Sequence, residues 1–145
     1  MRTRMLIAAA LTALAFAFSG CQPDNPDNGG EQAPKSPLSG TWELTAITTK
    51  VAVGSVDVSV YLVFSDTDFE IYQKIGEGRY SKFEGTYVYG QDKKLSGIYS
   101  NSRSWGPYDV EIASDNNSMT LSIGNESDTY KKIEAVPQGV KDNIY

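Results

Sequence analysis

The sequence predicts an all-β domain, a small eight-stranded antiparallel up-and-down barrel, preceded by a signal peptide and a disordered tether. Apolar and polar residues alternate repeatedly from residue 39 onward, which is the pattern of a strand with one buried face. Turn residues recur about every 8–12 residues, as in sandwiches and barrels. The connections between these strands are shorter than the dozen or more residues that a parallel crossover needs, so we expect an antiparallel meander.

The first 20 residues have the layout of a secretory signal. Two arginines among the first four residues precede an apolar run from Leu6 to Phe18. This run is shorter than the ~20 residues that a membrane-spanning helix needs, and a short basic start before such a run is typical of a signal peptide. Ser19 and Gly20 then stand directly before Cys21, the one cysteine of the chain.

Small residues directly before a cysteine resemble the lipobox of bacterial lipoproteins, although Phe18 stands where that family usually has leucine. The resemblance implies that the signal is cut before Cys21 and that this cysteine carries acyl chains such as palmitate. We therefore expect a lipoprotein of the cell envelope, held at the outer membrane through Cys21. The alternative is an ordinary secretory signal that leaves a free thiol, which is a liability in an oxidising compartment.

Residues 21–38 are expected to form the lipidated cysteine and a disordered tether. This stretch contains four prolines and a glycine pair but no aromatic residue, so it cannot bury enough apolar surface to offset the entropy of ordering. Its acidic residues also resemble the surface-export signals of lipoproteins in Bacteroidetes. The barrel domain is expected over residues 39–137, followed by a C-terminal tail at 138–145.

Composition excludes several function classes. The net charge is −5, so the basic footprint of a nucleic-acid-binding protein is missing. The chain has no histidine and one cysteine, which rules out Ser-His-Asp or Cys-His catalysis and removes the usual zinc donors. We therefore expect that the protein is not an enzyme and has no catalytic residues and no metal site. We also expect it to have no cofactor and to be a monomer.

The strands follow from the alternation and the turns between them. The clearest is 56–64, in which Val60, Leu62 and Phe64 share one face. The others are expected, in order, at 42–46, 69–75, 83–89, 95–99, 108–112, 119–123 and 130–135. The residues expected to face inward are Trp42, Leu44, Val60, Leu62, Phe64, Phe69, Ile71, Tyr87, Leu95, Tyr99, Val110, Ile112 and Leu121.

A glycine followed two residues later by an aromatic residue occurs four times, at Gly40/Trp42, Gly85/Tyr87, Gly97/Tyr99 and Gly106/Tyr108. Gly85 and Gly97 lie inside expected strands. Glycine there permits sharp coiling of the strand, and a nearby aromatic ring can cover the exposed backbone. The repeat therefore favours a strongly curved sheet.

The stretch Gly40-Thr41-Trp42 at the start of an eight-stranded meander resembles the lipocalins of the calycin superfamily, and with the lipobox it resembles lipocalin-like lipoproteins of Bacteroidetes. The resemblance implies a barrel that holds a small apolar ligand. Two features depart from that family. Pro137 to Tyr145 is too short for a helix across the barrel, and the arginine that packs on the tryptophan has no evident counterpart.

Two functions remain open. In the first, the barrel binds a small apolar or glycan-like ligand at an aromatic mouth, with candidate contacts Trp42, Tyr61, Tyr87, Tyr99, Trp105 and Tyr108. In the second, the barrel is filled and the protein is an interaction or inhibitor module that acts through a loop, either Asn101–Gly106 or Lys50–Ser55. A lumen void well below about 300 Å³ counts against the first function.

Overall fold

The computed structural model describes residues 35–48 and 56–145. Cys21, the expected signal peptide, most of the expected tether and the Lys50–Ser55 segment lie outside these residues. The described chain forms eight strands: β1 (Gly40–Thr48), β2 (Val58–Phe64), β3 (Asp68–Ile75), β4 (Ser81–Tyr89), β5 (Lys94–Tyr99), β6 (Ser104–Ile112), β7 (Ser118–Ile123) and β8 (Glu126–Ile133). One short helix, α1 (Gln138–Lys141), follows them.

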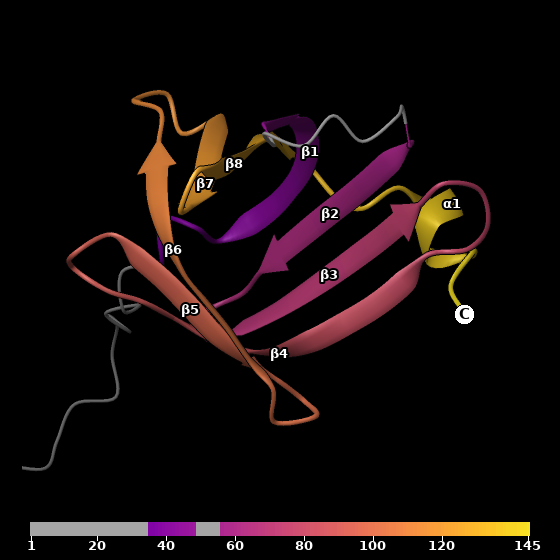
Figure 1. The fold of residues 1–145 in the computed structure, drawn as a ribbon, viewed down its shortest axis with the longest axis horizontal. Coiled ribbons are helices and arrows are strands. Elements are labelled where there is room, and N and C mark those ends of the chain that lie inside the picture. Colours follow the sequence, from indigo (N-terminus) through magenta and orange to yellow (C-terminus); the bar gives the residue numbers. More distant parts are fainter. Residues whose placement is uncertain (1–34, 49–55) are drawn as a thin grey trace, which may run out of the picture. The chain divides into compact units, whose positions relative to one another are not determined.

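The strands form a closed antiparallel barrel. Each strand pairs with the next along the chain, and β8 pairs back with β1 (Figure 1). The predicted fold class, strand number and up-and-down order are therefore confirmed. Because a meander returns at every turn, the barrel has two distinct ends. We call the end that holds the start of β1 the closed end, and the end that holds the last residue of β5 the open end.

The inward faces of the strands make the barrel core. All thirteen residues expected to face inward belong to one apolar cluster or pack directly against it. Three further core residues were not foreseen: Leu38, Met119 and Tyr130. The strand alternation therefore predicted most of the lumen correctly.

Leu38 corrects the boundary of the tether. We placed it at the end of the 21–38 tether, but its side chain is 0% exposed. Its carbonyl oxygen accepts a hydrogen bond from Nε1 of Trp42 at 2.8 Å. The residues just before β1 therefore belong to the folded domain and seal the closed end of the barrel.

Lys132 supplies the cation that the sequence did not reveal. Its Nζ lies 5.0 Å from the centroid of the Trp42 ring, within the range of a cation–π contact. A Cβ at Gly40 would lie 2.7 Å from Cε of this lysine, and the φ of Gly40 is +130°. Glycine is therefore required two residues before the tryptophan, which gives the Gly40-Thr41-Trp42 stretch its physical basis.

The segment after β8 packs against the outside of the barrel instead of extending as a tail. Val136 and Val140 form a second apolar cluster with Tyr61, Tyr72 and Tyr80. The amide of Tyr80 donates to the carbonyl of Asn143 at 2.8 Å. In Figure 1, α1 lies beside the end of β3 and the start of β4. The expected 138–145 tail is thus corrected to a folded cover over outward-facing tyrosines.

No helix in the described part of the chain has the length and apolar character needed to cross a membrane.

Candidate functional site

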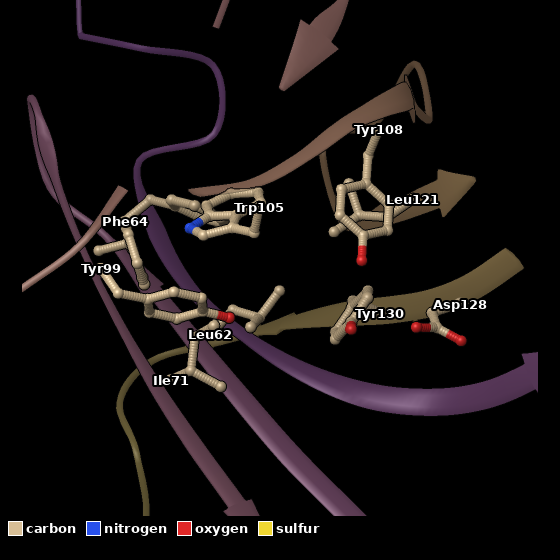
Figure 2. A pocket seen from close by; sticks show the side chains of 10 residues that line it. Leu62, Phe64, Ile71, Tyr99, Trp105, Tyr108, Leu121, Asp128 and Tyr130 are labelled. Carbon is tan, nitrogen blue, oxygen red and sulfur yellow. The ribbon is translucent and has the colours of Figure 1, made fainter. Parts of the chain in front are cut away.

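A cavity of about 90 Å³ lies inside the barrel. Its lining runs from Phe64, which pairs with Gly40 at the closed end, to Tyr99 and Trp105 at the open end. Its inner wall is apolar, and its outer wall carries tyrosines and one carboxylate (Figure 2). The lining residues are Leu62, Phe64, Phe69, Ile71, Tyr99, Trp105, Tyr108, Leu121, Asp128 and Tyr130. They come from β2, β3, β5, β6, β7 and β8, so the closed barrel brings together residues that are far apart in the sequence.

Trp105 is held in the wall by Gly97 on the neighbouring strand. The two residues pair across β5 and β6, and a Cβ at Gly97 would lie 2.5 Å from the indole ring. The ring centroid of Trp105 lies 5.2 Å from that of Phe69 and 6.0 Å from that of Tyr108. The aromatic ring that covers Gly97 thus comes from β6, and the Gly97/Tyr99 pairing that the sequence suggested is not the important one.

Three polar side chains, those of Tyr108, Asp128 and Tyr130, lie on one side of the cavity (Figure 2). Figure 2 shows the hydroxyl of Tyr108 pointing toward Tyr130, with Asp128 beside it. Burial raises the pKa of Asp128, and the nearby Glu126 carboxylate raises it further. Burial also raises the pKa of Tyr108 and of Tyr130, and the charge of Asp128 adds to both. The carboxylate and the two hydroxyls therefore share one poorly solvated environment.

These polar groups lack partners among the described residues. Nε1 of Trp105 is buried without a hydrogen-bond acceptor. Within residues 35–48 and 56–145, Asp128 makes no ion pair. On the outer surface of the barrel, four other carboxylates each contact a lysine: Glu43, Glu70, Glu84 and Asp109. Buried polar groups normally have partners, so the open end holds unused hydrogen-bonding capacity.

The structure brings together three of the six candidate residues. Tyr99, Trp105 and Tyr108 all line the cavity. Trp42 and Tyr87 also point inward, but they belong to the closed end, where the hydroxyl of Tyr87 donates to the carbonyl of Ser65 at 2.7 Å. Their groups are already occupied by contacts within the protein.

Tyr61 does not line the cavity. It follows Val60 and precedes Leu62, which both face the lumen, so the alternation of β2 turns it outward. There it packs near Tyr80, with 6.2 Å between the ring centroids. It belongs to the cluster beneath the C-terminal segment and is remote from the lumen.

Tyr130 and Asp128 line the cavity but were not predicted as site residues. We placed the start of the last strand at Tyr130, whereas β8 begins at Glu126. Because side chains alternate along a strand, Glu126, Asp128 and Tyr130 share one face. The inward direction of Tyr130 was therefore the available signal, but the acidic residues before it had the appearance of a solvated turn.

The cavity volume limits what can enter the barrel. About 90 Å³ is well below the ~300 Å³ at which pockets for drug-sized ligands begin. So small a volume counts against binding of a whole ligand inside the lumen. A small group can still enter, with the rest of the molecule outside the open end.

Other candidate features carry less chemistry. The Asn101–Gly106 region contains a four-residue connection between β5 and β6, tightened by a hydrogen bond from the amide of Ser102 to the carbonyl of Tyr99 at 2.8 Å. It is a compact turn and does not form a long protruding loop. Across the described residues, no group of three or more acidic, histidine or cysteine side chains could hold a metal ion.

No protein-family model matches the chain, and no curated protein matches it by sequence. Two solved structures are similar. An uncharacterized protein from Bacteroides eggerthii has 20% identity and a TM-score of 0.51, covering 66% of this chain and 99% of its own. A lipocalin-like protein from Bacteroides uniformis has 19% identity and a TM-score of 0.53, covering 68% of this chain and 100% of its own. At such identities the likeness shows the fold, a lipocalin-like barrel.

Proposed function

We propose that this protein is a lipocalin-like lipoprotein of the calycin superfamily and Bacteroidetes type, anchored to the outer membrane through an acylated Cys21. Its barrel binds a small apolar or glycan-like ligand by one end, in the cavity at the open end. The observation that supports this proposal is the convergence of Tyr99, Trp105 and Tyr108 on one cavity, together with polar groups that lack partners among the described residues.

The composition of the cavity wall suits ligand binding. Small-molecule sites are mostly apolar and aromatic, with a few polar groups that orient the ligand. Each tyrosine or tryptophan ring offers an apolar face and a polar tip. The volume of about 90 Å³ is smaller than the ~150 Å³ engineered cavity that accepts benzene. The part of the ligand that enters the cavity is therefore a small group of only a few heavy atoms.

The anchor rests on the sequence around Cys21. One acyl chain holds a protein only marginally, because each buried CH₂ contributes about 0.8 kcal/mol, so stable anchoring takes at least two signals. Lipoproteins with this kind of signal carry three chains on the cysteine, which makes the anchor effectively permanent. Replacing Cys21 by Ser is expected to release the protein from membrane fractions, and retention of the variant in those fractions would contradict the anchor.

Native mass spectrometry of the full chain from its source membranes tests the ligand. We expect a mass greater than that of the protein alone, because a ligand stays bound, and we expect this excess to be lost in a Trp105→Ala/Tyr108→Ala double variant. Val88→Ala is the matched control, because Val88 is 69% exposed on β4 and lies outside the cavity. Wild-type protein that carries no excess mass would refute ligand binding in the source cell.

The second candidate is a protein-interaction or inhibitor module. The small cavity favours it, since a filled barrel needs no ligand. It predicts that the cavity variants leave function unchanged and that a partner protein is retained instead of a small molecule. The same mass spectrometry experiment therefore separates the two candidates.

A further inference from the structure

We propose that the group entering the cavity is an organic cation: a primary ammonium on a short apolar stem, with the ammonium bound by Asp128. This inference rests on the proposed ligand-binding function and narrows it to one chemical class.

The charge of the cavity wall is the first argument. Asp128 is the one lining residue that carries a charge, and it has no ion pair within the described residues. Glu126 lies two positions earlier on the same face of β8 and adds a second negative charge nearby. A partly buried carboxylate without a counter-ion is electrostatically unfavourable. A ligand cation would remove that cost, whereas an anion would be repelled.

The hydrogen-bonding groups form the second argument. An ammonium group has three donors and no acceptor. Asp128 offers carboxylate oxygens, and the hydroxyls of Tyr108 and Tyr130 lie beside it (Figure 2). In the described part of the chain these two hydroxyls make no hydrogen bond. The wall therefore presents three acceptors at one place, which matches the donors of a primary ammonium.

The opposite wall matches an apolar stem. Leu62 and Ile71 line the cavity on the side away from Tyr108 and Asp128, and the rings of Tyr99 and Trp105 close it (Figure 2). Leu121, the third aliphatic residue of the lining, lies beside Tyr108. The rings also attract a nearby cation through their π-electrons. A volume of about 90 Å³ corresponds to about three water molecules at their share of liquid volume, which suits a stem of a few carbon atoms.

Three probes that share one stem test the inference: n-butylammonium, 1-butanol and butyrate. Binding to the full chain is followed by calorimetry and by tryptophan fluorescence at about pH 7, where a primary amine is charged. We expect n-butylammonium to bind at least about tenfold more tightly than 1-butanol, because a charge-assisted hydrogen bond is roughly twice as strong as a neutral one. Butyrate is expected to show no binding.

Asp128→Asn keeps the shape of the side chain and removes the charge. We expect it to bind n-butylammonium about tenfold more weakly and to leave 1-butanol binding unchanged. Asp109→Asn is the matched control, because Asp109 is exposed, pairs with Lys94 and is absent from the cavity wall. It should bind n-butylammonium as the natural chain does, which separates a local contact from a general charge effect.

The outcomes that overturn the inference need no variant. Equal binding of n-butylammonium and 1-butanol would refute the cation while leaving a ligand cavity in place. Failure of all three probes to bind would also refute it, and the mass spectrometry of protein from the source membranes would then decide the fate of the proposed function separately.

Discussion

The two ends of the barrel use the same residue types in opposite ways. At the closed end, Nε1 of Trp42 donates to a backbone carbonyl, its ring carries Lys132, and the hydroxyl of Tyr87 donates to Ser65. At the open end, Nε1 of Trp105 has no acceptor among the described residues, and Asp128 makes no ion pair within them. At the closed end, the buried hydroxyl of Ser39 is the one side-chain group that also has no partner among these residues.

This difference separates stability from binding within one barrel. Polar groups that are satisfied by the protein hold the fold together. Buried polar groups left without partners lower stability. Tyr108, Asp128 and Tyr130 border the cavity, which is where we propose that a ligand binds. The contacts of the closed end therefore stabilise the barrel, whereas the open end holds polar groups that contribute less to stability.

Replacing each tryptophan by alanine is expected to give the largest difference in stability between the two ends. Trp42 is 0% exposed, so Trp42→Ala should lower the free energy of unfolding by about 3–5 kcal/mol. Trp105→Ala should cost clearly less, because that ring is only partly buried and already borders a cavity. Urea unfolding of both variants measures the costs, and equal costs would contradict a division of roles between the ends.

Gly97→Ala perturbs the open end through the backbone. The new Cβ would collide with the indole of Trp105 at 2.5 Å, so the ring must move. We expect a loss of about 1–3 kcal/mol in unfolding free energy and a shifted tryptophan emission. Gly139→Ala is the control, since nothing lies within 4 Å of its Cβ, and its stability should not fall.

Removing a single tyrosine hydroxyl makes a matched test of hydrogen bonding. Tyr87→Phe loses the bond to the carbonyl of Ser65 and should cost about 0.5–1.5 kcal/mol. Tyr108→Phe removes a hydroxyl that makes no bond within the described residues, so it should change the unfolding free energy by less than about 0.5 kcal/mol. A larger loss for Tyr108→Phe than for Tyr87→Phe would reverse our assignment of the two ends.

Asp128→Asn should change the free energy of unfolding least of these variants, and it should raise that free energy instead of lowering it. Burial raises the pKa of Asp128 in the folded state, so the folded protein binds that proton more tightly than the unfolded chain does. The charged form therefore costs stability above the folded pKa, and this cost disappears as the pH falls through it.

We expect Asp128→Asn to be at least as stable as the natural chain at about pH 7, and the difference to vanish at about pH 3. Urea unfolding at both pH values measures this. A variant that is less stable at the higher pH would show that Asp128 is a structural group and would weaken its role in binding.

The fold could be predicted because its signal is local. Leu62 and Phe64 share one face of β2, and buried residues alternate with less buried ones in β5 and β7. Short connections then leave few topologies open. The alternation of apolar and polar residues therefore predicted the strands and their inward faces, and the short turns predicted the order of the strands in the barrel.

The site could be predicted only in part because its partners are distant in sequence. Residue type alone suggested Tyr61, although its strand turns it outward into the cluster with Tyr80. Asp128 was not singled out, because Tyr108, its neighbour in the cavity wall, lies on another strand. Lys132 was missed for the same reason. It lies on β8, directly opposite Trp42 on β1, and these strands are far apart in the sequence.

The most direct test of the account uses the two tryptophans of the chain, one at each end of the barrel. Their indole N–H signals are followed in a nitrogen-15 NMR spectrum while n-butylammonium is added. We predict that the Trp105 signal shifts and saturates while the Trp42 signal stays in place. A Trp42 shift as large as that of Trp105, or no shift of either signal, would contradict the account.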